Sequence, residues 1–163
     1  MKKIELVGKG TGIFSLVDDE WYDELNKYRW YLHERDNTSS CYAYRMERKN
    51  GKQKAIMMHR VIAGIENEYQ TDHINGNGLD NRAKNLRQCT HKENQRNKKK
   101  YKNNKSGYKG VRRKRNMWAA EIRVNNKTIH LGIFDTKEEA AEEYNRGAEK
   151  YHKSFARFNE IIN

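Results

Sequence analysis

The chain has 163 residues, a formal net charge of +12, and 35% hydrophobic against 34% charged residues. This length fits one ordinary domain or a few small ones and excludes a large metabolic fold, while the composition favours several thin cores over one thick core. No apolar run approaches the ~18 residues needed to cross a bilayer, so we expect no membrane contact. The two cysteines are too few for a disulfide framework or a four-cysteine zinc site. The first residues lack an apolar stretch of signal-peptide length, and we expect a cytoplasmic protein.

The positive charge is concentrated in the middle of the chain. Residues 1–81 carry 12 basic and 13 acidic side chains, residues 82–127 carry 17 and 2, and residues 128–163 carry 5 and 7. Such a basic block condenses on a polyanion with release of counterions, which makes nucleic acid the expected partner. For the lysine-rich stretch from Lys98 to Lys105 taken alone, a solvated linker is the favoured interpretation.

Residues 1–60 are predicted to be rich in β-structure. A strand over Ser40–Met46 leads to Asn50-Gly51, a strong signal for a hairpin turn, and a partner strand is expected over Lys54–His59. A short helix is predicted over Glu20–Leu25. Scattered aromatic side chains in this part are interpreted as core residues.

Residues 71–100 show a different order of elements. We predict a strand over Thr71–Ile74, a loop that contains two glycines, and a second strand over Asn85–Cys89. A helix follows, and its start is well marked because Thr90 and Glu93 have the spacing of a capping box.

Residues 106–159 are predicted to form three strands and one helix. The strands are expected over Gly110–Arg112, Trp118–Val124 and Thr128–Phe134, with Asn125-Asn126 as the turn between the last two. A second capping-box pattern, Thr136 with Glu139, opens the helix, whose apolar residues recur at helical spacing. The predicted fold class is therefore α+β, with small sheets and short helices.

The middle segment contains the residue types that hydrolysis of a phosphodiester bond requires. This reaction needs a base for the attacking water, a cation beside the phosphate and positive charge along the backbone. His73 can act as the base because an imidazole titrates near neutrality. Asp72 and Asn94 supply hard oxygen ligands, which suit Mg²⁺ and leave room for waters and the phosphate.

These residues, in this order, resemble the ββα-metal motif of the HNH endonucleases, in its phage homing-endonuclease form. The matching segments are Asp72–Gly76, Asp80–Arg82, Asn85–Arg87 and Thr90–Asn94. The resemblance implies that His73 is the general base and that Asp72 and Asn94 hold Mg²⁺ or Mn²⁺. It also implies that Asn85 ties the loop so that His73 is aimed at the water.

Neighbouring positions leave alternatives open. The family often has His where this chain has Asn94, so His91, one turn earlier, is the alternative ligand, and Asn94 is favoured. The pair His59-Arg60 lies where similar nucleases often carry His-Arg, with a role in packing or in phosphate contact. Arg87 is expected to contact backbone phosphates, with an ordinary surface charge as the alternative.

The last third of the chain resembles a second family. The segments Ser106–Arg112, Trp118–Arg123, His130–Phe134 and Ala140–Tyr144 are similar to the apetala or ethylene-response-factor type of DNA-binding domain. In that family a three-stranded sheet lies in the major groove. The resemblance implies that DNA is contacted by five side chains, Lys109, Arg112 and Lys114 on the first strand, Arg123 on the second and His130 on the third. A solvated strand face is the alternative.

Together these patterns predict a metal-dependent DNA endonuclease of homing type, which acts on double-stranded DNA as a monomer, with a dimer not excluded. The predicted parts are a β-rich module over 1–60, an HNH module over 61–100, a basic linker over 101–105 and a DNA-binding domain over 106–163. The alternatives are a sequence-specific DNA-binding regulator with an inactive nuclease motif and a repair or restriction nuclease. A phage gene, and with it the host bacterial cytoplasm, is implied by the resemblance alone.

Overall fold

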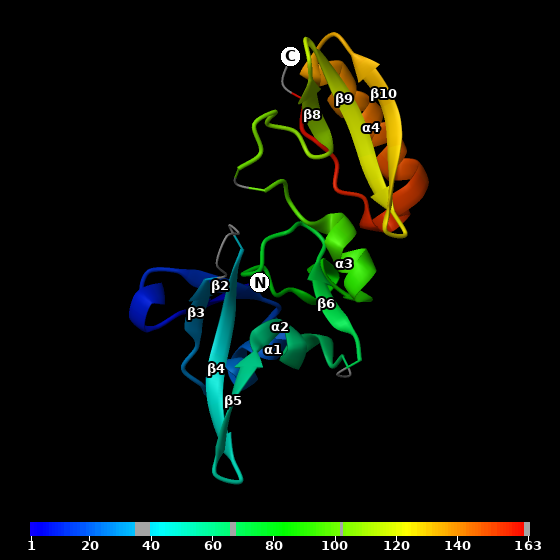
Figure 1. The fold of residues 1–163 in the computed structure, drawn as a ribbon. Coiled ribbons are helices and arrows are strands. Elements are labelled where there is room, and N and C mark those ends of the chain that lie inside the picture. Colours follow the sequence, from blue (N-terminus) through cyan, green and yellow to red (C-terminus); the bar gives the residue numbers. More distant parts are fainter. Residues whose placement is uncertain (35–39, 66–67, 102, 162–163) are drawn as a thin grey trace. The chain divides into compact units, whose positions relative to one another are not determined.

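The structure is a computed structural model that describes residues 1–34, 40–65, 68–101 and 103–161. The chain divides into two compact units, Met1–His91 and Lys92–Asn163. Sheets of two or three strands lie in the first unit, and a three-stranded sheet lies in the second (Figure 1). Small antiparallel sheets and helices make up both units, which confirms the α+β class. The predicted module boundaries stay predictions. Residues 35–39, 66–67, 102 and 162–163, which fall inside the predicted parts, lie outside the described residues.

The first unit begins with two small antiparallel sheets. One pairs β1 (Lys2–Glu5) with β2 (Phe14–Val17), with the 3-10 turn η1 (Gly8–Gly10) between them and helix α1 (Asp19–Leu25) after them. The other has the order β3-β4-β5 and consists of β3 (Tyr31–Glu34), β4 (Cys41–Lys49) and β5 (Lys52–Met57). The predicted hairpin turn is confirmed, because Asn50 and Gly51 have φ angles of 52° and 75°.

Helix α2 (Met58–Ala63) follows β5 directly, so the predicted strand over Lys54–His59 is wrong in its last two residues. Met58 and Ile62 lie four residues apart and are both buried, which places them on one face of a helix. This burial outweighs the strand pattern of the sequence. The change places His59 on a helix that packs against β4.

The segment that carries the nuclease motif forms a second hairpin. Strand β6 (Gln70–His73) pairs with β7 (Leu86–Cys89), and the 3-10 turn η2 (Ala83–Asn85) lies in the loop between them. Asn85 therefore ends a 3-10 turn and does not begin the second strand. Helix α3 (His91–Asn97) starts directly after Thr90, as predicted, and the division between the units falls after its first residue.

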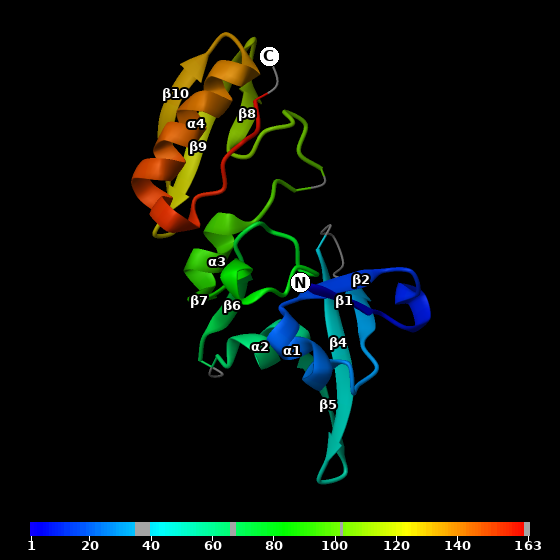
Figure 2. The ribbon, with the colours of Figure 1, turned by 180° about the vertical axis from the view of Figure 1, so that it is seen from behind.

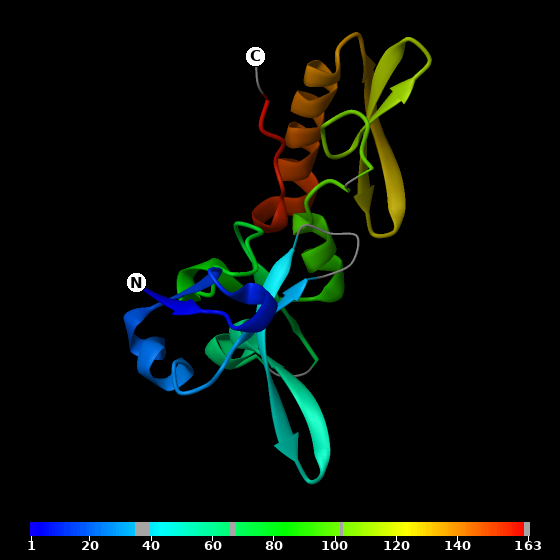
Figure 3. The same cartoon turned by 90° about the vertical axis from the view of Figure 1, so that its left-hand side faces the viewer.

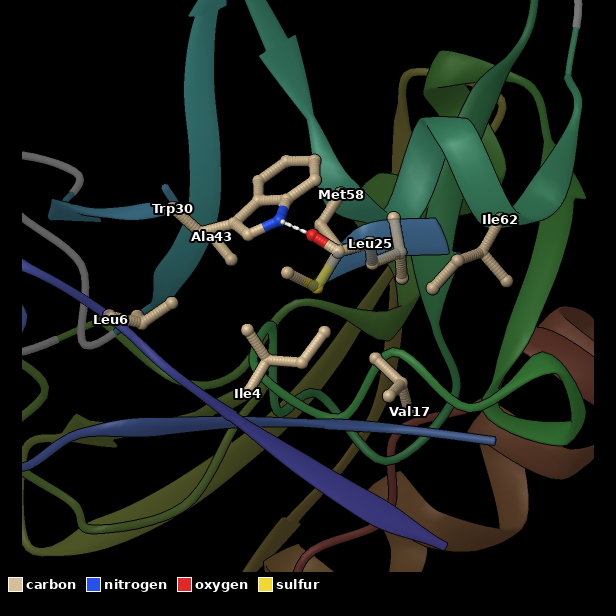
Figure 4. Close-up of a cluster of buried hydrophobic side chains, with 8 residues drawn as sticks. All are labelled: Ile4, Leu6, Val17, Leu25, Trp30, Ala43, Met58 and Ile62. Carbon is tan, nitrogen blue, oxygen red and sulfur yellow. Dashed lines mark hydrogen bonds between the residues drawn. The ribbon is translucent and has the colours of Figure 1, made fainter. Parts of the chain in front are cut away.

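Buried side chains from widely separated elements form the core of the first unit (Figure 4). They are Ile4, Leu6, Val17, Leu25, Trp30, Ala43, Met58 and Ile62. Trp30 is only 1% exposed, and its Nε1 donates a hydrogen bond of 2.8 Å to the carbonyl oxygen of Leu25. Leu79, from the loop between β6 and β7, and Leu86 pack against this core. The loop that carries the motif is therefore anchored on N-terminal residues.

The second unit is a three-stranded antiparallel sheet that packs against one long helix. The sheet has the order β10-β9-β8 and consists of β8 (Val111–Lys114), β9 (Met117–Val124) and β10 (Lys127–Phe134). Helix α4 (Lys137–His152) lies along one face of the sheet and leads to the 3-10 turn η3 (Lys153–Phe155) (Figures 2 and 3). Among the described residues, no helix has both the length and the apolar character needed to cross a membrane.

The turn and the helix cap predicted for this unit are confirmed. Asn125 and Asn126 have φ angles of 48° and 66°, as in a tight hairpin turn. Thr136 Oγ1 accepts a hydrogen bond from the backbone of Glu139, and the Glu139 carboxylate accepts one from the backbone of Thr136. The predicted apolar stripe of α4 is buried at Ala140, Ala141, Tyr144 and Ala148.

Gly110 offers a direct test of the packing between sheet and helix. It has a φ of 75°, and a Cβ at this position would meet the Tyr144 ring and lie 2.7 Å from the carbonyl oxygen of Glu121. We expect Gly110→Ala to destabilise the second unit by about 3 kcal/mol or more, because backbone strain and overpacking add. Gly107→Ala is the matched control, since φ is 84° there and no described atom lies within 4 Å of the added Cβ. An equal fall in Tm for the two variants in thermal unfolding would contradict this packing.

Candidate active site

A network of asparagine and aspartate side chains holds the loop between β6 and β7. Asn85 Nδ2 donates to the carbonyl oxygen of Asp80 at 2.7 Å, and Asn85 Oδ1 accepts from the backbone of Asn75 at 3.0 Å. Asn75 Nδ2 in turn donates to Asp80 Oδ2 at 2.8 Å. Asn and Asp suit such loops because their short side chains bond to nearby backbone groups. Asn85 therefore ties the loop, whereas its role in aiming His73 stays a prediction.

The carboxylate at the centre of this network is buried and ion-paired. Asp80 is 2% exposed and accepts hydrogen bonds from Arg82 Nε at 2.7 Å and Arg82 Nη2 at 2.6 Å. The hydrogen bonds from Arg82 lower the pKa of Asp80, although burial acts in the opposite direction. Asp80 consequently keeps its negative charge inside the loop.

His73 lies at the end of β6 and is 5% exposed. Its Nε2 is 3.0 Å from Oδ1 of Asn81, which is fully buried. Burial lowers the pKa of His73, and the hydrogen bond to Asn81 and the carboxylates of Asp72 and Asp80 oppose this shift. A lowered pKa keeps the imidazole neutral at neutral pH, which is the form that can accept a proton.

Two further aromatic rings pack around His73. The His59 ring meets it edge to face, with the centroids 5.1 Å apart, and the Tyr42 ring lies 5.8 Å from His73 and 5.5 Å from His59. Gly78 permits this arrangement, because a Cβ there would lie 2.7 Å from the Tyr42 ring. Burial lowers the pKa of His59 to about 3, with smaller contributions from His73 and Arg60. Among the described residues, His59 Nδ1 is buried without a hydrogen-bond partner.

Asp72 lies beside His73 on β6 and forms an ion pair across the hairpin. Arg87, its partner in the strand register, donates from Nε at 2.8 Å and from Nη2 at 2.6 Å to Asp72 Oδ2. Arg87 was expected at DNA phosphates, but in the structure it neutralises the predicted metal ligand. Its phosphate contact stays a prediction.

The donor set is compatible with a hard divalent cation. Asp72 provides carboxylate oxygen and Asn94 a neutral amide oxygen, and both are ligand types that Mg²⁺ accepts together with waters. Within the described residues, no group of three or more His, Cys, Asp and Glu side chains could hold a metal.

The residues predicted on helix α3 fall on either side of the division between the units. His91 belongs to the first unit, where its Nδ1 is 3.1 Å from Gln70 Nε2. Asn94 is half-buried and belongs to the second unit. Its pairing with Asp72 accordingly stays a prediction.

Four of the five residues predicted to face DNA share one face of the second unit's sheet. The register places Thr128 opposite Arg123 and His130 opposite Glu121, and strand alternation adds Arg112 and Lys114 to the same face. The predicted residues on this face, Arg112, Lys114, Arg123 and His130, are all exposed. The opposite face carries Val111, Ala120 and Ile122, which pack against α4.

Glu121 organises part of this face. Arg112 binds its carboxylate through Nε at 2.9 Å and Nη2 at 2.7 Å, and His130 Nδ1 lies 3.7 Å away. The hydrogen bonds from Arg112 lower the pKa of Glu121, so that the carboxylate stays charged. This ion pair restricts the orientation of the Arg112 guanidinium on the exposed sheet face.

Lys109 was predicted to lie on the first strand, and this prediction is wrong. Strand β8 begins at Val111, after Gly110 with its positive φ. The Lys109 ammonium donates to the carbonyl oxygens of Arg96 and Lys98 at 2.5 and 2.6 Å. Burial lowers the pKa of Lys109 to about 8. Its side chain is thus engaged inside the second unit and is absent from the strand face.

Comparisons with known proteins place the chain in a family. The HNH endonuclease family model matches residues 57–96. An uncharacterized HNH endonuclease of Acanthamoeba polyphaga mimivirus is 32% identical over 163 residues, covering 96% of this chain and 80% of that protein. The chain belongs to the HNH endonuclease family. This HNH protein is also 38% identical over 96 residues to "Protein 3.8" of Escherichia phage T7, which covers 58% of this chain and 78% of the phage protein. No solved structure gives a significant match.

Sequence reasoning missed two residues that contact the candidate base of this HNH protein. Asn81 was part of the matched segment Asp80–Arg82, but no role was assigned to it. Tyr42 was predicted only as a strand residue. A polar residue next to the motif's buried carboxylate is a usable signal for Asn81, whereas Tyr42 reaches the site through tertiary packing, which leaves no local pattern.

The half-buried His59 predicts acid destabilisation of the first unit. Its pKa is about 3 in the fold and about 6.5 in an unfolded chain, so the unfolded state binds more protons between these values. This contribution to the free energy of unfolding is complete above about pH 6.5 and is lost as the pH falls toward 3. His59→Phe should therefore reduce the fall in Tm between about pH 7 and pH 4. His33→Phe, at an exposed position on β3, is the control; equal pH dependence in both variants would contradict the assignment.

Proposed function

We propose that this HNH protein is a metal-dependent endonuclease that hydrolyses phosphodiester bonds in double-stranded DNA. The observation that carries the proposal is the imidazole of His73, which is hydrogen-bonded to Asn81 and lies beside the Asp72 carboxylate on one strand of the family's motif. Burial lowers the pKa of this imidazole, which favours its neutral form. The family membership and the basic middle of the chain support DNA as the substrate.

In the proposed reaction, His73 takes a proton from the water that attacks the scissile phosphate. The Asn85 network keeps the loop after His73 in one conformation, so that the base needs little reorganisation. Asp72 and Asn94 would hold Mg²⁺ or Mn²⁺, which supplies positive charge beside the leaving 3′-oxygen. The products are a 5′-phosphate and a 3′-hydroxyl.

The three-stranded sheet of the second unit is proposed to supply affinity for DNA and to align the protein on its target site. The basic face of this sheet is exposed, and the major groove of B-form DNA is wide enough to admit β-strands. The sheet-on-helix topology and its basic residues support the resemblance to the apetala type of domain. Homing on a specific site and a phage origin belong to this proposal, and the phage T7 relative is consistent with the latter.

One site of this kind cuts one strand, so we propose that a monomer nicks DNA and that a double-strand break takes a second chain or a second event. The Arg87–Asp72 ion pair supports the alternative, a DNA-binding regulator with an inactive motif, since it competes with a cation for the carboxylate. Cleavage assays separate the two functions.

His73→Ala should abolish nicking of a supercoiled plasmid while it leaves DNA binding intact. Loss of a general base lowers rates by about 10²–10⁴-fold, and addition of EDTA to the wild-type protein should have the same outcome, reversed by Mg²⁺ or Mn²⁺. His33→Ala, on exposed strand β3, serves as the control variant. Wild-type protein that binds DNA without scission in either metal would favour the regulator.

Removal of one basic side chain from the sheet face should weaken binding and flatten its salt dependence. For Arg123→Gln we expect the slope of log K against log salt to fall by about 0.9, because one phosphate contact is lost. Arg146→Gln is the matched control, because Arg146 is exposed on α4, which packs on the opposite sheet face. Binding isotherms at several salt concentrations that show equal slopes for both variants would exclude the sheet as the DNA-binding surface.

A further inference from the structure

A chain of buried hydrogen bonds runs from strand β2 to the candidate base. Asn81 Nδ2 is 2.7 Å from Ser15 Oγ, and Ser15 Oγ is 3.1 Å from the carbonyl oxygen of Leu79. At the other end of the amide, Asn81 Oδ1 is 3.0 Å from His73 Nε2. Ser15 and Asn81 are fully buried and His73 is 5% exposed. All four residues belong to the first unit.

The direction of these hydrogen bonds is determined at the end of the chain that is remote from His73. The Leu79 carbonyl can only accept, so Ser15 donates its single hydroxyl proton there, or to Met58 Sδ at 3.1 Å, which also accepts. In either case Ser15 Oγ has no proton left for Asn81 and must accept from it. The Asn81 amide nitrogen therefore faces Ser15, and its oxygen faces His73.

An amide oxygen can only accept, which makes His73 Nε2 the donor in the last hydrogen bond. A neutral imidazole has one N–H, so a proton on Nε2 leaves the lone pair on Nδ1. The hydrogen-bond direction at Ser15 on β2 thus sets the orientation of the Asn81 amide. That orientation in turn determines which nitrogen of His73 carries the proton.

The backbone of the same segment limits how far Asn81 can shift. Asn81 N donates to the carbonyl oxygen of Leu16 at 2.8 Å, and Leu16 N donates to the carbonyl oxygen of Leu79 at 2.8 Å. Both bonds attach the loop to β2 at Leu16, the residue that follows Ser15. With the amide reversed, Ser15 would donate its proton to Asn81, and its Oγ would face the Leu79 carbonyl oxygen at 3.1 Å with no proton between the two buried oxygens, which is costly.

We propose that Ser15 and Asn81 are positioning residues that hold His73 in its Nε2–H tautomer, so that Nδ1 is the atom that takes the proton from water. The proposal rests on the function proposed for His73. It assigns a role in the reaction to the β1–β2 hairpin, which lies outside the matched motif.

The test combines the tautomer of His73 with kinetics of plasmid nicking in Mg²⁺. In ¹H–¹⁵N spectra of the full-length chain, neutral His73 should carry its proton on Nε2, and Ser15→Ala and Asn81→Ala should populate the Nδ1–H form. In both variants we expect kcat for nicking to fall by about tenfold or more, because a wrong tautomer disables a general base, while KM for the plasmid is unchanged.

Val17→Ala controls for loss of stability, because Val17 is fully buried on the same strand and belongs to the apolar core. It should lower Tm yet keep the His73 tautomer and kcat below its unfolding temperature. A wild-type proton on Nδ1, or variants with an unchanged tautomer, would overturn the proposal. Wild-type protein with the Nε2–H tautomer and no nicking would contradict the nuclease function and leave the role of Ser15 and Asn81 in fixing the tautomer supported.

Discussion

The candidate site depends on buried polar side chains whose hydrogen-bond partners lie in the same loop or on the strand beside it. Asp80, Asn81 and Asn85 are 2%, 0% and 7% exposed, and a buried polar group without a partner costs roughly 1–3 kcal/mol. Each of them finds partners only when the loop between β6 and β7 adopts one conformation against β2. The loop is therefore specified by hydrogen-bond geometry, and the imidazole of His73 is held as a consequence.

This constraint explains why the N-terminal residues matter for the motif. Strand β2 contributes Ser15 to the polar chain and Val17 to the apolar core. The backbone of the same strand accepts from Asn81 through Leu16. Apolar burial supplies most of the free energy of folding, and the polar groups select one arrangement within it. The motif residues and the N-terminal sheets thus form one folded unit in Met1–His91.

Much of the fold could be predicted because the relevant signals are local. The Asn50-Gly51 turn, the Thr136–Glu139 cap and the helical stripe of α4 each follow from a few neighbouring residues. The positions of Asp72 and His73 on the first strand of the hairpin agree with the predicted strand, whereas Asn85 lies in a 3-10 turn and not at the start of the second strand. In contrast, the contact between Ser15 and Asn81 spans 66 residues and leaves no periodic pattern. The ammonium of Lys109 turns inward because carbonyl oxygens at the end of α3 bind it, which composition does not reveal.

The charge distribution can likewise be read from the sequence, whereas the ion pairs form only in the fold. The basic excess of residues 82–127 is visible in the sequence, but its use is set by pairing in the fold. Arg82 and Arg87 neutralise carboxylates in the motif, and Arg112 is braced by Glu121. Lys114 and Arg123 remain exposed on the sheet face, where charge is best placed to attract a phosphate backbone.

The most direct test of the account is a high-resolution crystal structure of the full-length chain on an uncleaved DNA duplex, with Ca²⁺ in place of Mg²⁺. We expect a water within hydrogen-bond reach of His73 Nδ1, about 2.6–3.2 Å, with the cation on Asp72 and the hydrogen bond from Nε2 to Asn81 retained. A water bound at Nε2 with Asn81 displaced, or a cation bound away from Asp72, would contradict it.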